Sequence, residues 1–146
     1  MDAILPAGGR IDGDFARQTG VSLKALLPLS DGTILDRTIR ALRDTGWVER
    51  IVLVGPDEVR EHRSSAAADA VLPEEPGRPS TGPSNILRAL RWLHETDGGP
   101  VAPRVLVITT DLPFLSAQTI NSFIDGCSEN ADIYAPLVNR DSFESR

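Results

Sequence analysis

The chain has 146 residues, of which 40% are hydrophobic and 25% charged, enough for one compact domain with a buried core. Its net charge of −6 argues against a nucleic-acid binder, which needs a basic surface. The single cysteine, Cys127, cannot form an internal disulfide and so favours a cytoplasmic location. The apolar stretch at the N-terminus is too short for a signal peptide or a membrane span, and we expect no membrane association.

Five short apolar runs, several rich in β-branched residues, predict strands. In chain order they cover residues 3–5, 51–54, 70–72, 105–110 and 133–138. The third is very short. The last is the weakest, because Pro136 lies inside it and proline in a sheet is typical of an edge position or a strand end.

Apolar residues at helical spacing predict helices between these strands. They cover residues 33–45, 83–95 and 116–127, with a poorer candidate at 57–65. Gly46 is a C-cap signal, and Ser84 and Ser116 are candidate N-caps. The alternation of apolar strands with helices predicts a single domain, residues 1–146, built as a three-layer α/β/α sandwich around a mostly parallel, Rossmann-like sheet.

In a sheet of this kind, ligands bind beyond the carboxyl ends of the strands. The first such loop reads Leu5-Pro6-Ala7-Gly8-Gly9-Arg10. Its two glycines can bring backbone N–H groups close to phosphates, and Arg10 adds donors suited to phosphate oxygens. Lys24 is expected to reach back over this loop and neutralise charge during phosphoryl transfer. The alternative is a tight turn with an ordinary surface lysine, and for the glycine pair alone that alternative is favoured.

Asp111 ends the apolar run 105–110, where a carboxylate is costly unless it faces a cleft. There it could take one position of an octahedral Mg²⁺ site, with phosphates and waters taking the others. The alternative, a helix cap, is less favoured because Ser116 is better placed for capping. The acidic pair Glu74-Glu75 is interpreted as solvated loop charges.

These motifs, in this order, resemble the MobA-like NTP transferases of the nucleotidyltransferase superfamily, from Met1 to about Val138. The resemblance rests on the opening loop, on Lys24-Ala25-Leu26-Leu27-Pro28, on Gly82-Pro83-Ser84-Asn85 and on Asp111-Leu112-Pro113. It implies that the metal ligand is Asp111 and that the catalytic cations are Lys24 and Arg10. It also implies that the nucleotide contacts come from Leu5, Ala7, Gly8, Gly9, Gly82 and Asn85.

The resemblance implies transfer of an NMP from an NTP to a phosphorylated small-molecule acceptor, with Mg²⁺ as cofactor and pyrophosphate as product. The acceptor could be a cofactor precursor or a sugar phosphate. Because the family's domain continues beyond this length, the resemblance also implies that the chain lacks its C-terminal part. Two alternatives are a non-catalytic nucleotide-binding remnant and a glycosyltransferase of the same architecture. The second usually carries an Asp-x-Asp motif, where this sequence has a single aspartate, Asp111.

Overall fold

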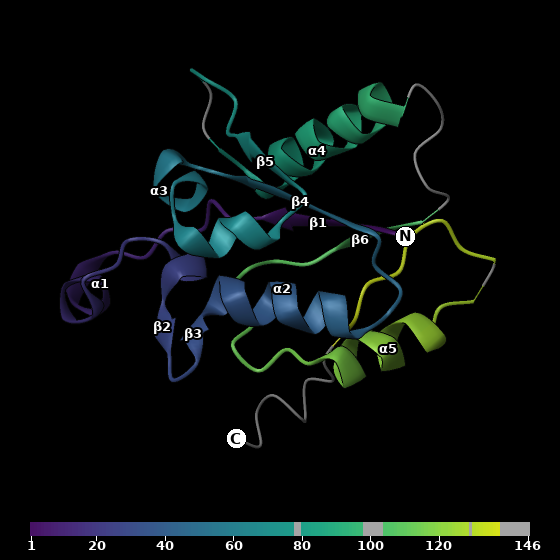
Figure 1. Cartoon of the computed structure of the whole chain (residues 1–146), viewed down its shortest axis with the longest axis horizontal. Coiled ribbons are helices and arrows are strands. Elements are labelled where there is room, and N and C mark those ends of the chain that lie inside the picture. The colour runs from purple at the N-terminus through teal and green to yellow at the C-terminus, as the bar shows by residue number, and fades with distance from the viewer. Residues whose placement is uncertain (78–79, 98–103, 129, 138–146) are drawn as a thin grey trace.

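The computed structural model describes residues 1–77, 80–97, 104–128 and 130–137 as a layered α/β domain (Figure 1). Its central sheet has four strands in the order β5-β4-β1-β6, and every neighbouring pair is parallel. The strands are β1 (Asp2–Pro6), β4 (Arg50–Gly55), β5 (Ala70–Pro73) and β6 (Val105–Val107). The parallel sheet predicted from the apolar runs is therefore confirmed.

The two central strands have almost continuously apolar sequences because helices cover both of their faces. Residues Ile51, Val52, Leu53 and Val54 of β4 are all fully buried. On one face, Ile4 and Val52 pack against Ala89 and Leu93 of α4 (Gly82–Asp97). On the other, the core includes side chains from α2 (Ile34–Asp44) and α5 (Ala117–Asp125). Figure 1 shows α4 on one side of the sheet and α2 and α5 on the other, which confirms the three layers.

Two predicted segments differ from the structure. β6 is shorter than the predicted run 105–110: the N–H of Ile108 still donates to the carbonyl of Ile4 at 3.1 Å, and the chain then leaves the sheet. The strand predicted at 133–138 is wrong over its described part, residues 133–137, which form no strand. There Ile133 and Leu137 are 85% and 93% exposed, so no neighbour covers the apolar side chains that suggested a strand.

The three helices α2, α4 and α5 begin at polar caps. Thr33 and Asp36 form a reciprocal capping box that starts α2, and Ser116 caps α5 as predicted. The predicted cap of α4 at Ser84 is wrong. The N–H of Ser84 donates to Thr81 Oγ1 at 3.2 Å and the N–H of Thr81 donates to Ser84 Oγ at 3.1 Å, so Thr81 is the cap and Ser84 its partner in the first turn.

Short elements complete the described chain. They are α1 (Gly13–Thr19), η1 (Lys24–Leu26), β2 (Pro28–Leu29), β3 (Gly32–Thr33), α3 (Asp57–Arg60) and η2 (Arg63–Ala67). The helix predicted at 57–65 is thus broken in two, and the Nδ1 of His62 at the break accepts from the N–H of Ser64. Among the residues described, no helix is long and apolar enough to cross a membrane.

Candidate active site

A pocket of about 210 Å³ opens at the carboxyl ends of the strands, between the loops that follow β1 and β6. From β1 the chain continues to β4 and β5, which lie on one side of β1 within the sheet. It then returns to β6, which lies on the other side of β1. Such a reversal of strand order separates the flanking loops and leaves a crevice for a ligand. The pocket is lined by Pro6, Gly8, Gly9, Lys24, Ser80, Thr81, Gly82, Asn85, Thr109, Thr110 and Asp111.

Gly8 and Gly9 of the glycine loop line one wall of the pocket, and they pass close to the side chains around them. A Cβ built on Gly8 would lie 2.2 Å from Oε1 of Glu74 and 3.0 Å from Oγ of Ser80. On Gly9 a Cβ would meet Cδ of Lys24 at 3.4 Å, an ordinary contact. Glycine at position 8 therefore leaves bare backbone facing the pocket.

The predicted contacts Leu5 and Ala7 do not line this pocket. Both are fully buried, and the N–H of Ala7 donates to the carbonyl of Val54 at 2.8 Å. They support the glycine loop from beneath, and their predicted contact with a nucleotide stays a prediction.

Lys24 lines the pocket from the first residue of η1, beside the glycine loop. Its N–H donates to the carbonyl of Gly9 at 2.9 Å, and the neighbouring residue, Leu23, is buried in the core. The side chain of Lys24, by contrast, faces the pocket and is 41% exposed. Its Nζ lies 3.3 Å from Oδ2 of Asp111, 87 residues further along the chain. The expected convergence of these two residues at one rim of the sheet is confirmed.

Asp111 lies in the turn after β6 and is 41% exposed. Its carboxylate is not a helix cap, since Ser116 has that role. In the part of the chain that the structure describes, no group of three or more His, Cys, Asp or Glu side chains could hold a metal ion. A single accessible carboxylate at the pocket fits a hard divalent cation that takes its remaining ligands from phosphates and waters.

A chain of polar contacts leads from the pocket-lining residues Asn85 and Ser80 to Glu74. Asn85, only 3% exposed, donates from Nδ2 to Oγ of Ser80 at 3.0 Å. Ser80 Oγ donates in turn to Oε1 of Glu74 at 2.5 Å. The interpretation of Glu74 as a solvated loop charge is therefore wrong, because it is partly buried against Gly8 and Ser80. It directly follows β5, so the same rule about strand ends that selected Asp111 could have found it.

Arg10, like Leu5 and Ala7, is a predicted residue that does not line the pocket. Its guanidinium lies 3.7 Å from a carboxylate oxygen of Glu58, and both side chains are more than half exposed. Its role in phosphate binding stays a prediction.

Residues that sequence reasoning missed are Thr109 and Thr110 before Asp111, and Ser80 and Thr81 before α4. The hydroxyls of Ser80 and Thr81 belong to the segment 73–83, whose composition, rich in Pro, Gly, Ser and Glu, indicated only a loop.

Comparison with known proteins decides the family. The sequence model of a family described as "MobA-like NTP transferase domain" matches residues 3–142. The chain belongs to this family. A phosphoenolpyruvate guanylyltransferase of Sphaerobacter thermophilus is 30% identical over 105 residues, covering 71% of this chain and 47% of the relative. MobA-like membership thus extends over almost the whole sequence.

Solved structures agree in fold with this MobA-like domain. A transferase of Thermus thermophilus superposes with a TM-score of 0.65 at 28% identity, covering 88% of this chain and 47% of its own. A nucleotidyl transferase of Methanothermobacter has a TM-score of 0.65 at 22% identity, covering 86% and 56%. Rv0371c of Mycobacterium tuberculosis in complex with manganese has a TM-score of 0.56 at 21% identity, covering 85% and 57%. The chain spans about half the length of these relatives.

Proposed function

We propose that this chain binds a nucleoside triphosphate in the pocket between β1 and β6 and transfers its nucleotidyl group to a phosphorylated small-molecule acceptor. The observation that carries the proposal is the 3.3 Å approach of Lys24 to Asp111 beside the bare backbone of Gly8 and Gly9. A cation, a carboxylate and a glycine loop at one pocket are what a triphosphate and its metal require. Membership of the MobA-like family supports the same reaction.

In this reaction an oxygen of the acceptor's phosphate attacks the α-phosphorus. A new P–O bond forms there, the bond from the α-phosphorus to the oxygen bridging to the β-phosphate breaks, and its electron pair leaves with pyrophosphate. An acceptor phosphate is already ionised near neutral pH, so no residue has to remove a proton from it. The chain's task is therefore to position the reactants and offset negative charge.

Each pocket wall has a separate role in the proposal. Gly8 and Gly9 admit the β- and γ-phosphates close to the backbone. Lys24 offsets the charge that develops on the phosphates, because its ammonium can move from Asp111 to a phosphate oxygen. Asp111 would hold Mg²⁺, which when bound supplies Lewis-acid polarisation of the phosphate oxygens.

The wall formed by Glu74, Ser80 and Asn85 would receive the nucleoside. Guanine carries two adjacent N–H donors, N1–H and N2–H₂, and a carboxylate can accept both. The carboxylate of Glu74 lies against Gly8 and Ser80, which both line the pocket. We therefore propose GTP as the substrate, which also agrees with the guanylyltransferase name of the 30% identical relative.

The test is pyrophosphate release by the purified chain with each of the four ribonucleoside triphosphates, Mg²⁺ and a panel of phosphorylated acceptors. Phosphoenolpyruvate heads the panel because it is in the relative's name, followed by sugar phosphates and molybdopterin. Release that requires both GTP and one acceptor supports the proposal. Saturable nucleotide binding without release for any acceptor would contradict transfer by this chain and favour a nucleotide-binding protein. Absence of nucleotide binding would contradict the site itself.

A further inference from the structure

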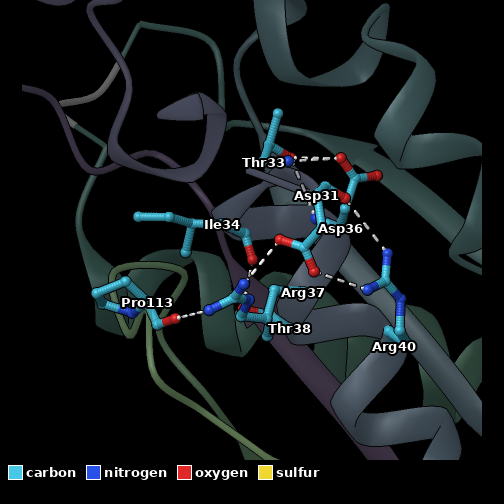
Figure 2. A network of polar contacts seen from close by, with 8 residues as sticks. All are labelled: Asp31, Thr33, Ile34, Asp36, Arg37, Thr38, Arg40 and Pro113. Carbon is cyan, nitrogen blue, oxygen red and sulfur yellow. Dashed lines mark hydrogen bonds and ion pairs between the residues drawn. The ribbon is translucent and has the colours of Figure 1, made fainter. Parts of the chain in front are cut away.

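The turn that carries Asp111 is held from outside by an arginine of α2. Nη1 of Arg37 donates to the carbonyl of Pro113 at 2.8 Å, two residues beyond Asp111. Figure 2 shows the guanidinium lying between this carbonyl and the side chain of Asp31. The Arg37 side chain is 29% exposed, which is low for an arginine at a helix surface. Because the donor is charged and partly shielded from water, this hydrogen bond is of the stronger kind.

The second terminal nitrogen of the same guanidinium is bound to Asp31. Nη2 of Arg37 donates to Oδ1 of Asp31 at 2.7 Å, and Nη1 of Arg40 donates to Oδ2 of the same carboxylate at 2.9 Å. Asp31 lies in the turn joining β2 and β3. The hydrogen bond from Arg37, followed by that from Arg40, lowers the pKa of Asp31 below its usual value. Asp31 is thus a permanent anion at neutral pH and fixes the direction in which Arg37 points.

The Asp111 turn has few other restraints among the described residues. Between β6 and α5 the chain has no helix or strand. The hydroxyl of Thr110 donates to the carbonyl of Pro6 at 3.4 Å, a long bond, and Nζ of Lys24 reaches Asp111 at 3.3 Å. Beyond Asp111, the N–H of Leu115 donates to the carbonyl of Leu112 at 3.2 Å and Leu115 packs against the core. The Arg37 bond to Pro113 is the shortest of these hydrogen bonds and comes from a charged donor on another element.

We propose that Arg37 is a positioning residue that holds the 111–113 turn so that the carboxylate of Asp111 faces Lys24 and the pocket. It links the turn that carries Asp111 to the hairpin next to Lys24 in the chain. Asp31 belongs to the hairpin that follows Lys24 in the chain, and Pro113 belongs to the turn that carries Asp111. The rigid body between them is α2, whose Leu35 and Leu42 are fully buried. The catalytic part of this inference rests on the proposed function, and the structural part does not.

Arg40 provides a matched control, because it is also an arginine of α2 bound to Asp31 and no contact between it and the Asp111 turn is described. The variants are Arg37→Met and Arg40→Met, since methionine keeps an apolar stem of similar length and so favours folding. Hydrogen exchange is measured on the protein without nucleotide or metal. We expect exchange across residues 109–115 to be about 10-fold faster in Arg37→Met, from the loss of one charge-assisted hydrogen bond, and unchanged in Arg40→Met. Exchange in α2 and β4 should be unchanged in both.

A second measurement uses turnover. Arg37→Met should lower kcat and raise the Mg²⁺ concentration for half-maximal rate by about 10-fold, whereas Arg40→Met should change neither by more than about twofold. Arg37→Lys, which can still donate to Pro113, should recover part of the lost exchange protection. Equal exchange across 109–115 in the two methionine variants, or faster exchange throughout α2 in Arg37→Met, would overturn the inference. Absence of turnover in the unaltered protein would contradict the proposed function, while the exchange experiment would still decide the role of Arg37.

Discussion

Substitution of Gly8 by alanine tests the closest approach in the candidate site. The new Cβ would lie 2.2 Å from Oε1 of Glu74 and 3.0 Å from Oγ of Ser80. The Glu74 side chain is flexible and would turn away, which breaks its 2.5 Å hydrogen bond from Ser80. A hydrogen bond to a charged group contributes about 1.5–3 kcal/mol. Since water can replace part of it at this partly exposed position, we expect a loss of about 1–2 kcal/mol.

The assay is urea unfolding followed by circular dichroism, in which Gly8→Ala should lower the midpoint without changing the slope. Gly9→Ala is the control. Its Cβ would be 3.4 Å from Lys24 Cδ, so it should stay within about 0.5 kcal/mol of the unaltered protein. Both substitutions restrict the unfolded chain in the same way, and that contribution cancels in the comparison.

A double-mutant cycle makes the same test sharper. In a Glu74→Ala background the carboxylate is gone, so Gly8→Ala should have almost no further cost. The coupling between the two sites should then be about 1 kcal/mol or more. A cost of Gly8→Ala that is the same in both backgrounds would refute the contact between Gly8 and Glu74, and with it the assignment of Glu74 to the pocket wall.

Three further predictions use other contacts. Thr33→Ala removes the capping box of α2 and should lower the free energy of unfolding in urea by about 1 kcal/mol. Thr33→Ser, which keeps a hydroxyl, should retain most of that stabilisation. Burial acts to raise the pKa of Asp69, but hydrogen bonds from the N–H of Ile51 and from Arg43 outweigh it and lower this pKa. The stabilisation of the fold by the Asp69 carboxylate is therefore complete above the pKa that Asp69 has in the unfolded chain, and it is lost as the pH falls below about 4. In Asp69→Asn the free energy of unfolding should therefore fall less steeply with decreasing pH. Glu74→Gln should reduce the preference for GTP over ITP, which lacks the 2-amino group, by about 10-fold, and Glu75→Gln should leave it unchanged; equal preference in all three proteins would contradict recognition of guanine by Glu74.

Much of the fold could be predicted from the sequence because burial on both faces leaves a plain signal. The run 51–54 is apolar at every position, and it is a central strand with every residue buried. The helix at 33–45 was found to within a residue at each end, because its apolar spacing and its cap agree. The run 133–138 misled because local composition says nothing about whether a partner strand exists, and there Ile133 is 85% exposed.

The candidate site was predictable where residues follow strands and less so elsewhere. Gly8 and Asp111 lie in the loops that follow β1 and β6, so the rule about carboxyl ends was sufficient to bring them together. Lys24 lies far from any long strand, and it was predicted as a cation that could reach back over the glycine loop. Glu74 directly follows β5 and meets the same rule, but it was missed because its acidic pair was interpreted as solvated charges. Arg37 was missed because its partner is the backbone carbonyl of Pro113, and a backbone acceptor leaves no residue type in the sequence to point to it.

The central claim is that Lys24 and Asp111 act on one nucleotide in one pocket. Pyrophosphate release by Lys24→Ala, Asp111→Asn and the double variant tests it most directly. We expect each single variant to lose about 100-fold or more in kcat, and the double variant to be no slower than the worse single one, since residues that act as a unit are not additive. Losses that multiply in the double variant, or a single variant with unchanged turnover, would contradict the claim.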